Sequence, residues 1–196
     1  MSLTDNYTRR APWIETNMEI VKKWTDSDFP GNTLGTCAAQ VLMWCKSLEG
    51  GASGTGLKES LLSPYDKATA LQFGPLENGA ALARIASSTV DLRQKNSAKL
   101  IKELTPWSGK YKLYGISNNK GHGHMIGAYF PWSGPVQFYD PNLVCGTIKS
   151  TGSVYEVLSD WVDIYQGCGG LDASWGHETL FVISDPEAAL KKLNAV

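Results

Sequence analysis

The spacing of apolar residues changes at Pro106, and this change limits the folds that the chain can adopt. Before Pro106, apolar side chains recur at helical spacing and predict helices at about residues 14–24, 36–48, 80–93 and 97–104. After it, short segments rich in aromatic and branched residues predict strands at 111–117, 125–130, 136–139 and 180–184. Helices first and strands second indicate an α+β domain, with N-terminal helices packed on a C-terminal antiparallel sheet.

Two helices in the second half of the chain carry capping signals. A helix over 153–165 is expected to begin at Ser153, and Glu156 has the spacing of a capping box. A terminal helix follows Asp185, which is the expected cap, with Pro186 at its first position. These signals predict where the two helices start.

Length and composition favour one domain. The chain has 196 residues, of which 42% are hydrophobic, and this is enough to form a single core. We expect one domain over 1–196. It consists of an N-terminal helical segment (1–30), a helical half (31–104) and a sheet half (105–196).

Charge and hydropathy exclude some classes of partner. The net charge of -1 and the pI near 6.3 give no reason to expect nucleic acid or an anionic membrane. No apolar run reaches the length of a membrane span, and the start MSLTDNYTRRAPWIE has no signal-peptide core. We therefore expect no stable membrane insertion and no cleaved signal. The 4 cysteines include no CxxC pair, which favours free thiols in a reducing compartment.

Cys37 lies where a glycine-containing loop meets the first turn of a predicted helix. A helix N-terminus lowers the pKa of a thiol, and its free N–H groups can bind an oxyanion. The alternative is that Cys37 is a small apolar core residue. That interpretation fits the other three cysteines better. The cysteine alone does not decide between these roles.

The segment 121–142 adds a histidine and an acid. If residues 125–130 and 136–139 form a hairpin with its turn centred on Trp132, the numbers of paired residues sum to 264, and His124 lies opposite Asp140. A carboxylate in that place fixes the tautomer of a histidine that acts as a base. The alternative is a structural histidine beside an ordinary Asp-Pro-Asn turn. A one-residue slip in register would separate the pair.

A cysteine at a helix start, a histidine on a strand and an acid on the next strand form the layout of a papain-like Cys-His-Asp site. The segments GTCAAQVLMW, GHMIGAY and FYDPN resemble those of the YopT/AvrPphB family of bacterial effector cysteine proteases. The resemblance covers residues 32–44 and about 121–165, and it implies a papain-like fold. By position it makes Cys37 the nucleophile, His124 the general base and Asp140 its orienting acid. It assigns the oxyanion hole to the Asn32 side chain and the Cys37 N–H.

Other polar and aromatic residues near these motifs suggest two further sites. His122 and His124 form an HxH pair that, with His177 and Glu178, could bind a metal. Gly121 and Gly123 argue for a flexible loop instead, so we expect no metal and no cofactor. We expect His122 and Trp132 to line a substrate cleft, although aromatic residues in a sheet are more often part of the core.

The sequence favours a thiol protease of bacterial effector type that cleaves a host or target protein. It would be made in the bacterial cytoplasm and secreted without a cleaved signal. The same triad could serve a deamidase, a transglutaminase-like acyltransferase or a cell-wall amidase. A third possibility is a non-catalytic partner-binding domain whose cysteine, histidine and aspartate are structural.

Overall fold

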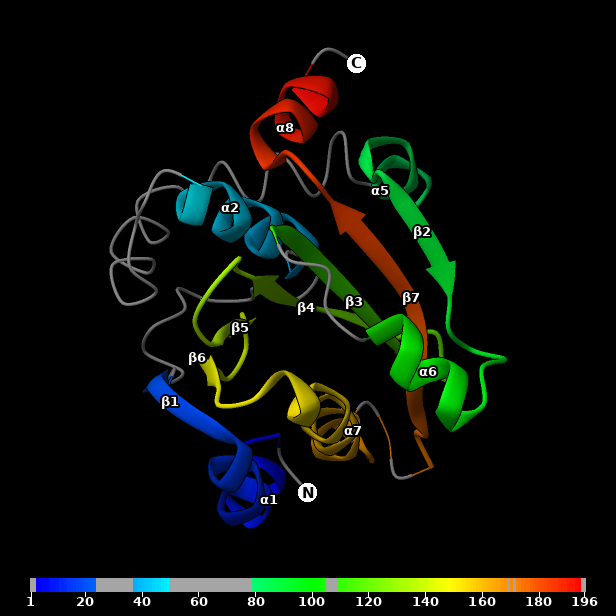
Figure 1. The fold of residues 1–196 in the computed structure, drawn as a ribbon. Helices are drawn as coiled ribbons and strands as arrows, with labels where there is room; N and C mark the ends of the chain where they lie inside the picture. Colours follow the sequence, from blue (N-terminus) through cyan, green and yellow to red (C-terminus); the bar gives the residue numbers. More distant parts are fainter. Residues whose placement is uncertain are drawn as a thin grey trace.

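The computed structural model describes residues 3–23, 37–49, 79–104, 109–168, 170 and 172–194. Within them, seven strands form one sheet in the order β1-β6-β5-β4-β3-β7-β2, and every neighbouring pair is antiparallel (Figure 1). The strands are β1 (Met18–Lys23), β2 (Ser88–Asp91), β3 (Lys110–Asn118), β4 (Gly123–Phe130), β5 (Val136–Asp140), β6 (Val144–Ile148) and β7 (Trp175–Ile183). The antiparallel sheet in the second half of the chain is confirmed.

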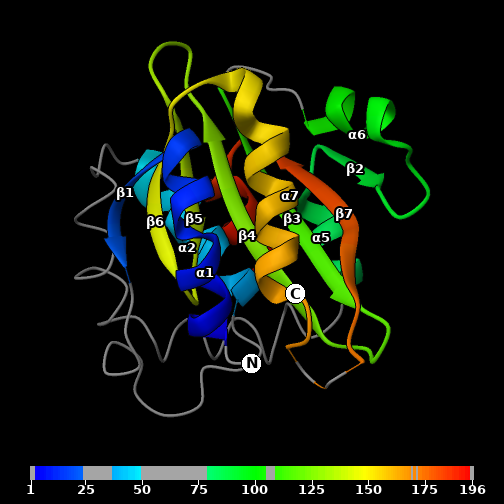
Figure 2. The same ribbon diagram turned by 90° about the horizontal axis from the view of Figure 1, so that it is seen from below.

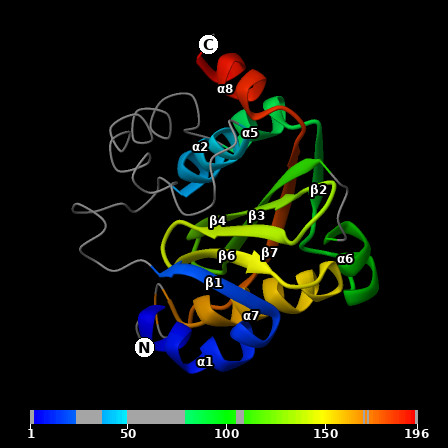
Figure 3. The ribbon, with the colours of Figure 1, turned by 60° about the vertical axis from the view of Figure 1, so that its left-hand side comes forward.

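Helices cover both faces of this sheet. They are α1 (Leu3–Asn17), α2 (Cys37–Glu49), α5 (Gly79–Ile85), α6 (Ser97–Leu104), α7 (Val154–Tyr165) and α8 (Pro186–Asn194), with a 3-10 turn η2 (Thr151–Ser153) before α7. Figure 3 shows α2, α5 and α8 on one side of the sheet and α1, α6 and α7 on the other. Figure 2 shows α1 and α7 side by side across their face, where they contact each other. The fold is therefore a three-layer α+β domain.

Each face of the sheet has its own apolar core. On the α1 and α7 face, Trp161 packs edge-on against Phe138 with ring centroids 4.5 Å apart. On the α2 face, Trp44 stacks on Tyr139 at 5.5 Å. Phe138 and Tyr139 are neighbours on β5, so the alternation of side chains along one strand supplies both cores.

Two predicted helices end earlier than expected, because residues placed in their C-terminal parts form strands. The helix predicted over 14–24 ends at Asn17, and Met18–Lys23 is strand β1. Met18 is buried while its neighbour Glu19 is exposed, which is the period of a strand. Pairing with β6 satisfies its backbone groups.

The helix predicted over 80–93 ends at Ile85, and Ser88–Asp91 is strand β2, paired with β7. Its Ser-Ser-Thr-Val run favours a helix only weakly, and the edge of β7 offers backbone partners. Strand β6 was not predicted. It contains Gly146, whose hydrogen lies against the backbone of Glu19 on β1, so a side chain there has no room.

The helix starts are partly as predicted. Helix α2 begins at Cys37, and α8 begins at Pro186 with the Asp185 carboxylate accepting the N–H of Ala188 at 2.7 Å. The capping box at Ser153 is wrong, because Ser153 makes no side-chain cap bond. Ser150 caps the preceding 3-10 turn instead and accepts the N–H of Gly152. No helix in the described part of the chain is long and apolar enough to cross a membrane.

Candidate active site

Helix α2 holds Cys37 at its first residue and packs closely on β4. The contact is at Gly127, where a Cβ atom would lie 2.7 Å from Cγ1 of Val41 and 2.9 Å from the Trp44 ring. Glycine thus lets the helix approach the sheet more closely than any other residue allows. The backbone N–H groups in the first turn of α2 have no partner within the helix. The positive end of the helix dipole therefore lies at Cys37.

His124 is the second residue of β4 and is 6% exposed. Its Nε2 atom lies 3.1 Å from Oδ1 of Asp140, the last residue of β5. The register differs from the expected one, since Ala128 pairs with Phe138 and the numbers sum to 266. The slip is two residues, so His124 and Asp140 stay on one face as diagonal neighbours. The predicted register is wrong, yet the pair forms.

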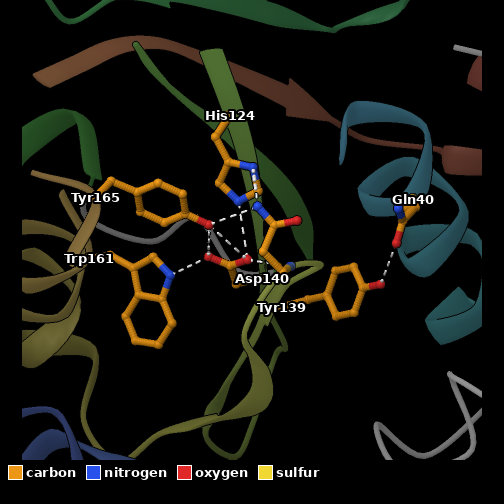
Figure 4. A network of polar contacts seen from close by, with 7 residues as sticks. Gln40, His124, Tyr139, Asp140, Trp161 and Tyr165 are labelled. Carbon is orange, nitrogen blue, oxygen red and sulfur yellow. Dashed lines mark hydrogen bonds and ion pairs between the residues drawn. The ribbon is translucent and has the colours of Figure 1, made fainter. Parts of the chain in front are cut away.

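Asp140 is fully buried and accepts hydrogen bonds from four residues (Figure 4). Besides His124, the donors are the backbone N–H of Asn142 at 2.7 Å, Nε1 of Trp161 at 2.5 Å and the hydroxyl of Tyr165 at 3.0 Å. Buried charges are stable only when they are paired and hydrogen-bonded in this way. The donors fix the direction of the carboxylate and hence that of the imidazole.

Two side chains contact the imidazole of His124 directly. The ring of Tyr165 stacks on it, with centroids 4.7 Å apart and planes inclined by 23°. The Nδ2 atom of Asn142 lies 3.4 Å from Nδ1 of His124 and donates to the Tyr165 hydroxyl at 3.3 Å. Because Nε2 faces Asp140, Nδ1 is the ring nitrogen left to exchange a proton with Cys37.

The electrostatics of Cys37 and His124 are complementary. Burial opposes the thiolate, but a hydrogen bond to His124, the charge of that ring and the backbone N–H groups of Met125 and Ala38 outweigh it, so the pKa of Cys37 is lowered. Burial also opposes the imidazolium, but the charge and hydrogen bond of Asp140, together with Cys37, raise the pKa of His124 to about 10. Both shifts favour a thiolate beside an imidazolium.

The other cysteines lack these features. Cys45 is fully buried, and burial raises the pKa of its thiol well above the ordinary value. Burial also raises the pKa of Cys168, which is half-buried. Cys145 is buried on β6. Among the four cysteines only Cys37 combines partial exposure with a lowered pKa.

The structure does not describe Asn32, and it places the other two predicted site residues, His122 and Trp132, outside the lining of the cavity beside Cys37. His122 is exposed in the turn before β4, where its Nδ1 lies 3.2 Å from Nδ2 of Asn118. Trp132 is 83% exposed and lies against Gly109. It is eight residues from His124 along β4 and the turn, which at about 3.3 Å per residue places it roughly 25 Å from the site.

The histidines do not gather around a common point. In the described ranges, no group of three or more His, Cys, Asp and Glu side chains has the geometry to bind a metal ion. His177 pairs with Ile116 on β3, and burial lowers its pKa. Within the described ranges, His122 and His124 therefore have no third side chain with which to bind a metal ion.

A cavity of about 390 Å³ opens beside the pair. Cys37 and His124 both line it, so a ligand there reaches the sulfur and the imidazole together. Its other walls are mainly apolar, as is typical of ligand pockets.

This fold, with a cysteine-led helix packed on an antiparallel sheet that carries histidine and aspartate, is papain-like. It matches the crystal structure of the Pseudomonas avirulence protein AvrPphB with a TM-score of 0.52, over 79% of this chain and 98% of that chain, at 15% sequence identity. The likeness supports the fold expected from the sequence motifs. No protein-family model and no curated protein matches the sequence.

Asn142, Trp161 and Tyr165 contribute to the site in ways that the sequence motifs did not reveal. Asn142 belongs to the motif FYDPN, but only as a turn residue. Trp161 and Tyr165 lie on α7 outside every motif that pointed to the site. Their spacing of four is the available signal, because it places the indole N–H and the phenol hydroxyl on the same helix face.

Proposed function

We propose that this chain is a papain-like cysteine protease in which Cys37 is the nucleophile, His124 the acid and base, and Asp140 the residue that orients the imidazole. The observation that carries the proposal is the continuous contact from the Cys37 thiol through a buried imidazole to a buried carboxylate. Nucleophile, base and orienting acid in hydrogen-bond reach are the signature of covalent acyl transfer.

The residues imply the following sequence of steps. The Cys37 thiolate attacks the carbonyl carbon of the scissile peptide, and the backbone N–H of Cys37 donates to the oxyanion. His124 then gives its Nδ1 proton to the departing amine, which leaves an acyl-enzyme. Water attacks this thioester while His124 takes the proton, and the carboxylic acid product leaves Cys37 free. Asn32 is proposed as a second oxyanion donor.

The electrostatics argue against a purely structural role for Cys37. A structural thiol gains from burial among apolar groups, which raises its pKa, as at Cys45. Cys37 has the opposite shift and lines an open cavity with its base. These facts support an enzyme rather than a partner-binding domain with an inert cysteine.

The effector role is part of the same proposal. The structural neighbour is an avirulence protein, which supports a protein of a host or target cell as the substrate. We propose that the chain is made in the bacterial cytoplasm and secreted into a host or target cell. A reporter fused to the chain would measure its transfer into target cells, and no transfer from an export-competent strain would contradict this.

The direct test of the chemistry uses pure wild type, Cys37→Ala and His124→Ala. New N-termini are identified by mass spectrometry after incubation with a proteome-derived peptide mixture. We expect cleavage by the wild type alone, with circular dichroism unchanged in both variants. Hydrolysis at an unchanged rate in Cys37→Ala would end the proposal. Products with converted glutamine side chains and no new N-termini would assign the triad to a deamidase or an acyltransferase.

A further inference from the structure

The cavity beside Cys37 has an acidic side chain among apolar walls. Leu82 of α5, Ile116 of β3, Met125 of β4 and Phe181 of β7 supply apolar surface. Among the residues that the structure describes, Glu178 of β7 is the only one that brings a carboxylate to this cavity. A charged carboxylate between apolar walls costs free energy unless a ligand or solvent forms hydrogen bonds or an ion pair with it.

A β-bulge directs Glu178 to this position. On β7, Thr179 pairs with Gly115 and His177 pairs with Ile116, so Glu178 between them has no partner residue on β3. Bulges redirect side chains and are common beside active sites. Gly115, which faces the bulge, also lines the cavity and leaves space there because it has no side chain.

The Glu178 carboxylate has no ion pair or hydrogen bond from any side chain in the described ranges. The charge of Glu178 acts on Arg93, but the pKa of Arg93 is raised mainly by its hydrogen bond to Asp91 and by the charge of Asp91, and Glu178 is the smallest cause. The guanidinium of Arg93 binds the Asp91 carboxylate at 2.8 Å in an exposed loop. No cationic side chain of the described ranges is therefore paired with the Glu178 carboxylate, and a cationic group of a ligand in the cavity can be its partner.

We infer that this cavity binds the arginine or lysine side chain of a substrate residue close to the scissile bond, with Glu178 as its ion-pair partner. Such side chains have an apolar stem and a cationic end, which match the apolar walls and the single carboxylate. This inference rests on the proposed function, because the cavity is a substrate subsite only if Cys37 is the nucleophile.

The charge of the cavity can be measured without any substrate. Methanethiosulfonates react with the Cys37 thiolate to form a mixed disulfide and release methanesulfinate. The probes are the 2-aminoethyl reagent, which is cationic, and the 2-sulfonatoethyl reagent, which is anionic. The ratio of their rate constants at Cys37 reports the charge beside the sulfur, because effects on thiol reactivity itself cancel.

We expect Glu178→Gln to lower the cation-to-anion rate ratio about tenfold, and Glu178→Lys to reverse the preference. Glu156→Gln is the matched control, since it removes one exposed carboxylate from α7 on the other face of the sheet. We expect the ratio in this control to match the wild type. A ratio that Glu178→Gln leaves unchanged, or that the control lowers equally, would overturn the inference. Thermal unfolding of each variant verifies that it is folded.

Peptides then separate the inference from the proposed function. Each position next to the scissile bond is varied between arginine, leucine and glutamate, and the ratios of kcat/KM are compared. We expect one position to prefer arginine over leucine by about tenfold or more, and Glu178→Gln to remove most of that preference. Cleavage that requires Cys37 but shows no basic preference at any position would reject only the subsite. Cleavage that survives in Cys37→Ala would reject the proposed function.

Discussion

His124 donates from Nε2 to Oδ1 of Asp140 across a distance of 3.1 Å, and both side chains are buried. The two residues lie diagonally across β4 and β5 and not directly opposite each other. Asp140 has three further donors in Asn142, Trp161 and Tyr165. These donors come from the turn between β5 and β6 and from helix α7. The orientation of the carboxylate therefore does not depend on how β4 and β5 pair.

Replacing Asp140 by asparagine is expected to lower both stability and reactivity. The amide removes the negative charge that raises the pKa of His124. Its N–H groups also face other hydrogen-bond donors, where the carboxylate had accepted their hydrogen bonds. Loss of one partner in a buried charge network costs about 3 kcal/mol of unfolding free energy. Urea unfolding of Asp140→Asn measures this. The control is Asp163→Asn, which breaks a half-exposed ion pair with Arg10 and should cost no more than about 1 kcal/mol.

The same substitution has a pH signature. The raised pKa of His124 contributes stability that is fully present below pH 6.5 and is lost as the pH rises to about 10. The difference in unfolding free energy between wild type and Asp140→Asn should therefore narrow over that range. A difference that is constant from pH 6.5 to 10 would show that the His124 charge is not linked to Asp140.

Cys37 is expected to react with iodoacetamide at neutral pH far faster than the other cysteines. Its lowered pKa arises despite burial, mainly through the hydrogen bond and charge of His124. In His124→Ala the thiol loses both, so alkylation should require a pH closer to the free-thiol value of about 8.5. Mass spectrometry of each cysteine between pH 5 and 10 measures this, with buried Cys45 as the internal control. Equal rates at Cys37 in wild type and His124→Ala would contradict the pairing.

The sequence predicted the contact between His124 and Asp140 better than the strands around it. Cys37, His124 and Asp140 were recognisable because each sits at the end of a helix or strand inside a short motif. The hairpin register was off by two residues, since the exact loop geometry is not encoded by the apolar pattern. Even spacing keeps the same face, so His124 and Asp140 still meet.

Strands β1, β2 and β6 were not predicted, for a different physical reason. Strands β1 and β2 depend on partners far away in the chain, since β1 pairs with β6 and β2 pairs with β7, whereas β6 also pairs with the adjacent β5. Their short apolar patterns fit a helix or a turn equally well, and tertiary pairing decides between them. The contacts of Trp161 and Tyr165 with Asp140 likewise require α7 to cross the sheet, which local spacing does not specify.

Tyr165→Phe should separate the ring stacking of Tyr165 from the hydrogen bonds of its hydroxyl. The phenyl ring can keep the stacking on His124, whereas the hydrogen bonds with Asp140 and Asn142 are lost. We expect the unfolding free energy to fall by about 1.5 kcal/mol, the usual range for a hydrogen bond to a charged group. Cys37 alkylation at neutral pH should slow several-fold, because the carboxylate is held less firmly. Tyr155→Phe, on the same helix, is the control and should change stability by no more than about 0.5 kcal/mol.

Gly127→Ala tests whether close packing of α2 on β4 positions Cys37. The new methyl group would lie 2.7 Å from Cγ1 of Val41 and 2.9 Å from the ring of Trp44, so the helix must shift. We expect a loss of about 1 to 3 kcal/mol in unfolding free energy, as for other overpacked sites, together with slower Cys37 alkylation. Gly176→Ala is the matched control on β7, because nothing lies within 4 Å of its added methyl group.

Val41→Ala in the Gly127→Ala background provides the decisive comparison. Truncating Val41 alone removes a buried side chain and should destabilise the fold. In the double variant the smaller side chain makes room for the added methyl group, so the two costs should sum to more than the measured loss. Recovery of Cys37 alkylation in the double variant would tie the reactivity of the thiol to the spacing between α2 and β4. If the losses in unfolding free energy were strictly additive and Cys37 alkylation did not recover, the contact between Val41 and residue 127 would not position Cys37.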